Sequence, residues 1–220
     1  MTTPVLYEAA FRLPTDRAWE LLKDPVVMAR AMMIAVVGRG CEMTRTEANL
    51  TWRAGGRRSD ATNEIVVRTT VPIDGSMTLG PWRPVRPVTQ VKLDWQPGDQ
   101  VYFHLTGNPS ARPGPILEPA LQEGWLRKYS DRAMEINQLS VTQRAPVRSA
   151  TRNAVFCRAD FTGTGVVTDP EALAGLLVNG VGRLKSYGFG MLRLAPVLAE
   201  ASVDPVAAGG RERELVGAGR

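Results

Sequence analysis

The clearest candidate for chemistry is the glycine-rich segment 179–196, which reads NGVGRLKSYGFGMLRLAP. Its four glycines form two Gly-x-Gly pairs, one on each side of Arg183 and Lys185. Glycine allows positive φ and lets the backbone approach a ligand closely. Because two cations stand beside such a backbone, the segment is a candidate phosphate site.

Two common phosphate motifs do not fit this segment. A P-loop places Lys-Ser/Thr directly after Gly-x-x-x-x-Gly, and a dinucleotide fingerprint follows a strand and opens a helix. Here residues 169–179 predict a helix before the glycines, and residues 187–195 predict a strand after them. A helix C-terminus disfavours anions, so phosphate affinity would come from Arg183, Lys185 and loop amides. The alternative is a purely structural, glycine-ended helix joined tightly to a buried strand.

The composition limits the class of protein. The 220 residues carry 27 Lys+Arg against 22 Asp+Glu, a net charge of +5 that is compatible with a nucleic-acid partner without requiring one. Cys41 and Cys157 are too few for a disulfide framework or a zinc motif, so the reducing cytoplasm is the expected location. The apolar run 31–37 is too short to span a bilayer, and no membrane partner is expected.

The second half of the chain has the pattern of a ferredoxin-like domain. Its predicted elements, in order, are a strand at 99–108, a helix at 118–129, strands at 134–146 and 152–167, a helix at 169–179 and a strand at 187–195. Strand, helix, strand, strand, helix, strand is the ferredoxin-like order.

The first half begins in the same way but has no obvious second helix. Its predicted elements are a strand at 5–12, a helix at 24–37, strands at 49–54 and 64–70, and a fourth strand near 90–95. Asp24 and Pro25 are the cap and first residue expected of a helix start.

The predicted fold class is therefore α+β, with two tandem ferredoxin-like (RRM-like) domains. The expected domains are 1–90 and 91–199. A tail at 200–220 is rich in Ala, Gly and charge without periodicity, and is expected to be mobile.

Four landmarks within residues 88–196 resemble the CasE family, the CRISPR-associated repeat-RNA endoribonucleases of type I-E systems. In chain order they are VYFHLTGNP, GWLRKY, FTGTGVVTDP and GVGRLKSYGFGMLRLAP. The resemblance implies a protein that binds the stem-loop of CRISPR repeat RNA, cuts it at the 3′ base of the stem, and stays bound as a Cascade subunit. The reaction that it implies is metal-free and uses no cofactor: the RNA 2′-OH attacks the adjacent phosphate, leaving a 2′,3′-cyclic phosphate.

The resemblance places the family's catalytic histidine on the first helix, where this chain reads PVVMARAM. Ala29 occupies the histidine position, and Val26 occupies that of a tyrosine found in some members. Neither side chain can move a proton, so we expect tight binding and very slow cleavage. An engineered histidine-to-alanine change and a natural loss of cleavage both explain Ala29.

The resemblance also implies other site residues. Lys185 matches the family's loop lysine and is the candidate cation beside the scissile phosphate, with Arg183 in the same loop. His104 lies on the polar face of its strand, at a position that is commonly arginine in the family, and Asn108 belongs to the family's Asn-Pro pair. Both are expected to contact RNA, and His104 is also considered as a substitute base.

Arg144, Arg148 and Arg152 flank the turn between the strands at 134–146 and 152–167. The family places a basic hairpin against the RNA stem here, where phosphates are the expected contacts because the A-form major groove is too narrow to read. The alternative is a charge cluster that is merely solvated. At the level of the whole protein, the rival hypothesis is a non-catalytic RNA-binding subunit that caps the guide RNA. A weaker one is a mononucleotide-binding protein.

Overall fold

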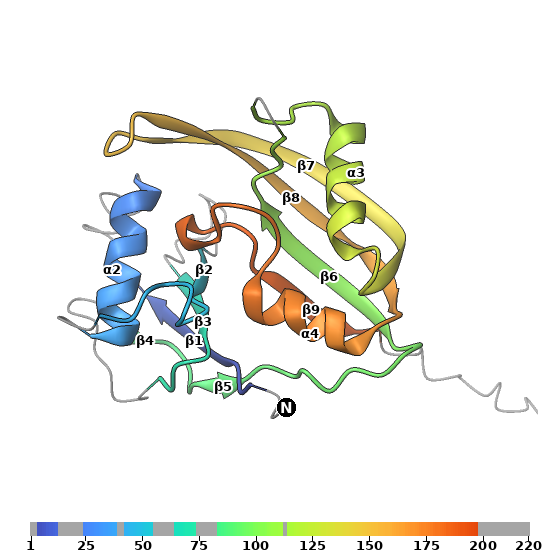
Figure 1. The fold of residues 1–220 in the computed structure, drawn as a ribbon, viewed down its shortest axis with the longest axis horizontal. Coiled ribbons are helices and arrows are strands. Elements are labelled where there is room, and N and C mark those ends of the chain that lie inside the picture. Colours follow the sequence, from blue (N-terminus) through green and yellow to red (C-terminus); the bar gives the residue numbers. More distant parts are fainter. Residues whose placement is uncertain are drawn as a thin grey trace, which may run out of the picture.

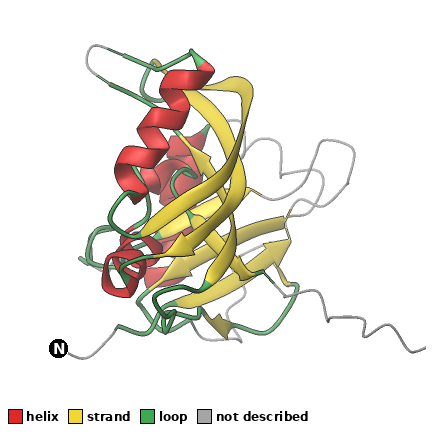
Figure 2. Cartoon of the chain, turned by 90° about the vertical axis from the view of Figure 1, so that its right-hand side faces the viewer, coloured by secondary structure: helices red, strands yellow, loops and turns green. Residues whose placement is uncertain are grey.

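Two antiparallel sheets form the framework of the protein, and the helices lie on one side of them (Figures 1 and 2). The structure is a computed structural model that describes residues 4–12, 24–38, 42–54, 64–73, 83–111 and 114–197. Cys41 and the tail 200–220 lie outside these residues. So do residues 74–82, which belong to the segment 70–90 in which the sequence shows no obvious second helix for the first domain.

The first sheet has the strand order β2-β3-β1-β4, and β5 also pairs with β1. Its elements are β1 (Tyr7–Arg12), α2 (Pro25–Val37), β2 (Thr51–Ala54), β3 (Glu64–Thr69), β4 (Arg83–Pro84) and β5 (Thr89–Gln90). The second sheet has the order β7-β8-β6-β9. Its elements are β6 (Gln100–Gly107), α3 (Pro119–Ser130), β7 (Met134–Ser149), β8 (Ala154–Val167), α4 (Pro170–Asn179), the 3₁₀ turn η1 (Lys185–Tyr187) and β9 (Leu192–Pro196).

Both sheets place their first and third strands in the centre, with the second and fourth strands at the edges. This is the ferredoxin-like arrangement. The predicted α+β fold class with two ferredoxin-like domains is confirmed.

Two predicted strands differ from the structure. The prediction of a strand near 90–95 is wrong. Only Thr89–Gln90 pairs with β1, and β4 is a separate two-residue strand. Pro84 and Pro87 have no N–H to donate to a ladder, which limits pairing between β4 and β5. The last strand begins at Leu192 rather than 187, because Gly188 and Gly190 have φ of 89° and 82°, which no strand residue adopts.

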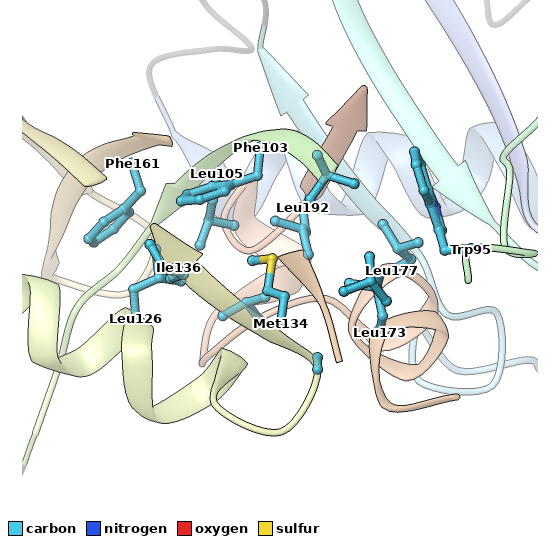
Figure 3. Close-up of a cluster of buried hydrophobic side chains, with 14 of the residues drawn as sticks. Trp95, Phe103, Leu105, Leu126, Met134, Ile136, Phe161, Leu173, Leu177 and Leu192 are labelled. Atoms are coloured by element: carbon cyan, nitrogen blue, oxygen red, sulfur yellow. The ribbon is translucent and has the colours of Figure 1, made fainter. Parts of the chain in front are cut away.

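The larger core lies between the second sheet and helices α3 and α4 (Figure 3). Val101, Phe103 and Leu105 point into this core from β6, as their alternation predicts. Leu126 of α3 and Leu173 of α4 face them across it. Each such side chain contributes about 1.5–3 kcal/mol by leaving water, so this core fixes the second sheet against its helices.

Helix α2 covers the first sheet. Asp24 caps it by accepting a hydrogen bond from the Val26 N–H at 2.8 Å, and Pro25 is its first residue, as predicted. Met28, Met32 and Val36 recur every four residues and are buried against that sheet. Ala29 lies on a neighbouring part of the helix surface and packs elsewhere.

Candidate functional site

Three segments that are distant in the sequence meet around Ala29. Its side chain is 0% exposed and packs with Phe156 of β8 and with Tyr187 and Phe189 of the glycine-rich segment. Figure 1 shows the far end of the β7–β8 hairpin reaching over α2, with the loop that contains η1 beside them. The structure therefore brings the helix, the basic hairpin and the glycine-rich loop to one place.

Asp24 ties the hairpin to the start of α2. Besides capping the helix, its carboxylate accepts hydrogen bonds from Ser149 Oγ at 2.9 Å, Thr151 N–H at 3.0 Å and Thr151 Oγ1 at 2.8 Å. Burial alone would raise the pKa of Asp24, but these bonds and the one from Val26 outweigh it and lower the pKa well below its ordinary value. The residues that carry the basic turn are thus anchored beside Ala29.

The glycine-rich loop folds back on itself and onto the end of β6. Val181 N–H donates to Gly190 O, and Gly190 N–H donates to Thr106 O, both at 2.8 Å. Gly182, Gly188 and Gly190 have positive φ, as does Leu184. These glycines use the positive φ that the sequence makes available to them, and Leu184 adds a left-handed residue directly before Lys185 that the sequence did not indicate.

Two of these glycines make room for tryptophans of the protein itself. A Cβ at Gly182 would lie 2.5 Å from Trp125, and one at Gly188 would lie 2.8 Å from Trp52. Trp52 also donates its indole N–H to Ser186 O at 2.8 Å. The loop is therefore clamped to both domains.

Lys185 and Tyr187 lie on the single turn η1. The aliphatic stem of Lys185 runs past Gly180 and Gly190, where a Cβ would lie 3.1 Å from its carbons. The Tyr187 ring stacks on Phe156 with centroids 5.7 Å apart. Two guanidinium groups lie over the same ring, Arg152 at 5.2 Å and Arg45 at 5.7 Å. Among the residues around Ala29, Arg45 and Tyr187 were not predicted, because neither stands in a recognisable motif.

The three hairpin arginines do not form one cluster. The strands extend to Ser149 and from Ala154, so the turn is shorter and lies further along than predicted. Arg152 is in the turn, and Arg148 lies near the end of β7, two residues before the turn begins. Arg144 instead lies across from Arg158 on the sheet and forms an ion pair with Asp160 at 2.6 Å.

His104 also lies away from Ala29. It sits on β6, where its Nδ1 is 3.1 Å from Arg53 Nη1. Burial lowers the pKa of His104, and the positive charge of Arg53 lowers it further. A neutral imidazole can accept the Arg53 hydrogen bond at Nδ1, so His104 is a partner of Arg53 and stands apart from the residues around Ala29.

Asn108 and Arg183 line a depression of about 310 Å³ beside the glycine-rich loop. Asn108 is only 6% exposed, and Phe156 and Leu184 both line this depression and pack in the cluster around Ala29. Both predicted contacts therefore lie close to the Ala29 junction, and Arg183 is exposed there.

In the described part of the chain, no three His, Cys, Asp or Glu side chains gather as metal ligands would. None of the described helices has the length and apolar character needed to cross a membrane.

A family model described as "CRISPR associated protein" matches residues 7–196. The chain belongs to this family. A search of curated proteins found no match.

Solved structures similar to this CRISPR-associated protein share its fold over most of its length. Thermus thermophilus Cse3 bound to an RNA that represents a pre-cleavage complex is 24% identical, with a TM-score of 0.77, covering 87% of this chain and 100% of that one. CRISPR endoribonuclease Cse3 bound to a 19-nucleotide RNA is 25% identical, with a TM-score of 0.75, covering 89% and 100%. Cas6e from Escherichia coli K-12 is 19% identical, with a TM-score of 0.67, covering 87% and 100%.

Proposed function

We propose that this CRISPR-associated protein binds the stem-loop of a CRISPR repeat RNA and stays on it as a subunit of an RNA-guided surveillance complex. The observation that carries the proposal is the junction of α2, the β7–β8 hairpin and the glycine-rich loop around Ala29, with Arg152 and Arg45 over Tyr187. RNA-bound Cse3 and a subunit of a CRISPR RNA-guided surveillance complex share the fold and support it.

The reaction assigned to this junction is a metal-independent transesterification. The RNA 2′-oxygen attacks phosphorus, the bond to the 5′-oxygen breaks, and a 2′,3′-cyclic phosphate and a 5′-OH result. One proton leaves the 2′-OH and one reaches the 5′-oxygen, so the step needs a proton acceptor, a donor and a cation for the phosphorane. Lys185 is the cation in this proposal, and Ala29 stands where the acceptor is expected.

The second candidate is a non-catalytic subunit that caps the guide RNA. It is favoured by the surroundings of Ala29, which is fully buried among apolar side chains. The apolar cluster around Ala29 consists of aliphatic and aromatic side chains, of which Tyr187 carries a hydroxyl group. A chain with this packing can hold an RNA hairpin without providing a base.

Single-turnover cleavage of repeat RNA in EDTA tests the proposal with three proteins: the chain itself, Ala29→His and Ala29→Gln. Histidine should restore cleavage by about 10²–10⁴-fold, with a pH-rate profile that turns near the imidazole pKa. Glutamine has a similar size and cannot act as the base, so it controls for the crowding that any larger residue creates at this buried position. Overpacking costs about 1–3 kcal/mol, which urea unfolding of both variants should show equally.

The outcomes separate the two candidates. Cleavage by Ala29→His alone supports the endoribonuclease framework, and tight hairpin binding without cleavage in all three proteins supports the cap. Equal cleavage by the chain and by Ala29→His would overturn the role assigned to position 29. Absence of hairpin binding by the chain would overturn both candidates.

A further inference from the structure

The face of the second sheet that looks away from α3 and α4 carries an unusual set of side chains. Along β6, Tyr102, His104 and Thr106 alternate with the core residues Val101, Phe103 and Leu105 and therefore point to this face. Tyr102 is 53% exposed, and its cross-strand neighbours are the small residues Thr164 and Ala195. An aromatic ring thus lies open on the surface of a ferredoxin-like sheet.

Four arginines lie on, or reach, the same face as His104. Arg193 of β9 is the cross-strand neighbour of His104, and Arg53 reaches His104 from the first sheet. Arg158 of β8 and Arg144 of β7 are cross-strand neighbours of each other. We call Arg53, Tyr102, His104, Arg158 and Arg193 the basic sheet face. It draws on both domains and is separate from the Ala29 junction.

The positive charge of this face exceeds the negative charge beside it in the described structure. Asp160 accepts hydrogen bonds from Thr106 and Arg144, and its charge also attracts Arg53 and Arg158. Among the described residues, however, no carboxylate forms a direct ion pair with Arg53, Arg158 or Arg193. The Nε atoms of Arg53 and Arg158 are buried and have no hydrogen-bond partner there. Unpaired guanidinium groups held this close repel each other, so an anion that bridges them would be bound favourably.

We infer that the basic sheet face binds single-stranded RNA adjoining the hairpin, with phosphates at Arg53, Arg158 and Arg193 and one base stacked on Tyr102. Planar guanidinium groups suit phosphate, and an exposed ring on the same face suits a base without regard to its identity. RRM sheets hold single strands with the corresponding surface of the same fold. The inference rests on the proposed hairpin binding and adds a second contact to it.

Fluorescence anisotropy with the full chain tests this inference. The probes are the hairpin alone and the hairpin with an extension of about eight nucleotides on its 5′ or its 3′ side, a length within the usual single-strand site size. One of the two extensions should tighten binding by about tenfold. It should also steepen the salt dependence of log K by about 0.7 for each phosphate bound.

Substitutions test whether the basic sheet face is responsible for the affinity gained from the extension. Tyr102→Ala should remove most of the gain from the extension, Tyr102→Phe should keep it, and Arg158→Ala should lower the added salt slope by about 0.7. Hairpin-only affinity should stay unchanged in all three. Tyr129→Ala on α3, behind the sheet, is the matched control and should retain the full gain.

The binding results distinguish failure of this inference from failure of the proposed function. A hairpin that binds while neither extension adds affinity overturns this inference and leaves the proposed function standing. A gain that survives both Tyr102→Ala and Arg158→Ala places the single strand elsewhere and overturns it as well. If the hairpin itself does not bind, the proposed function fails and this inference fails with it.

Discussion

Asp24 and Thr151 are joined by two hydrogen bonds although 127 positions separate them in the sequence. The carboxylate that starts α2 therefore also fixes the turn of the β7–β8 hairpin. This link holds the two domains together at the proposed RNA-binding junction, so one side chain sets both the position of Ala29 and that of the basic turn.

Replacing Asp24 with alanine should destabilise the protein by about 2–3 kcal/mol, because the helix cap and the hairpin anchor are lost together. Urea unfolding measures the change. Asp94→Ala, at an exposed aspartate with no side-chain hydrogen bond in the described structure, is the control and should change stability by less than about 0.5 kcal/mol. Equal effects of the two substitutions would contradict an anchoring role.

The anchor should also depend on pH. Because the pKa of Asp24 is lower in the folded protein than the unfolded value of about 3.9, its contribution is complete above that pH and is lost as pH falls through the folded pKa. The gap in unfolding free energy between the chain and Asp24→Asn should therefore narrow below about pH 4. A gap that stays constant down to the acid limit of folding would argue against a carboxylate-specific effect.

Gly182→Ala should destabilise the protein by roughly 2–4 kcal/mol, since the new Cβ meets Trp125 at 2.5 Å and the backbone has φ of 77°. Gly175→Ala is the matched control, because Gly175 lies inside α4 with nothing within 4 Å of its Cβ position. That change should instead stabilise by about 0.5–1 kcal/mol. Thermal or urea unfolding of both variants checks whether the free energy of unfolding falls in Gly182→Ala and rises in Gly175→Ala.

Arg148 and Arg152 should contribute to binding of the RNA hairpin by contacting its phosphates. Each alanine substitution should flatten the dependence of log K on log salt by about 0.7–0.9. Arg144→Ala should flatten it less for a hairpin without extensions, because Arg144 is paired with Asp160 on the sheet. If a variant with Arg144, Arg148 and Arg152 all changed to alanine shows an unchanged dependence of log K on log salt, the β7–β8 hairpin does not contact the RNA.

Lys185 should affect cleavage more than binding, because a cation near the scissile phosphate is most useful when charge accumulates in the phosphorane. In the Ala29→His background, Lys185→Met should lower the single-turnover rate by about 10²-fold or more and weaken hairpin binding by less than about tenfold. Losses of equal size in rate and affinity would make Lys185 a binding residue only.

Several features of this protein could be predicted because their signals are local. Asp24 and Pro25 mark the start of α2 by helix-end chemistry, and the alternation along β6 places Val101, Phe103 and Leu105 in the core. The prediction of a strand near 90–95 was wrong, because only Thr89–Gln90 pairs with β1 and pairing at a sheet edge depends on tertiary contacts that local sequence does not specify.

By itself, the sequence determined the ferredoxin-like order of elements in the second half and the freedom of the loop glycines to adopt positive φ, because both depend on local residue types. Only the tertiary structure decided that Gly182 faces Trp125, that Arg45 and Arg152 share the ring of Tyr187, and that Arg53 reaches His104. The physical reason is that these contacts join segments far apart in the sequence, some within the second domain and some between the two domains, and such segments meet only when the chain has folded. No local periodicity or cap records that geometry.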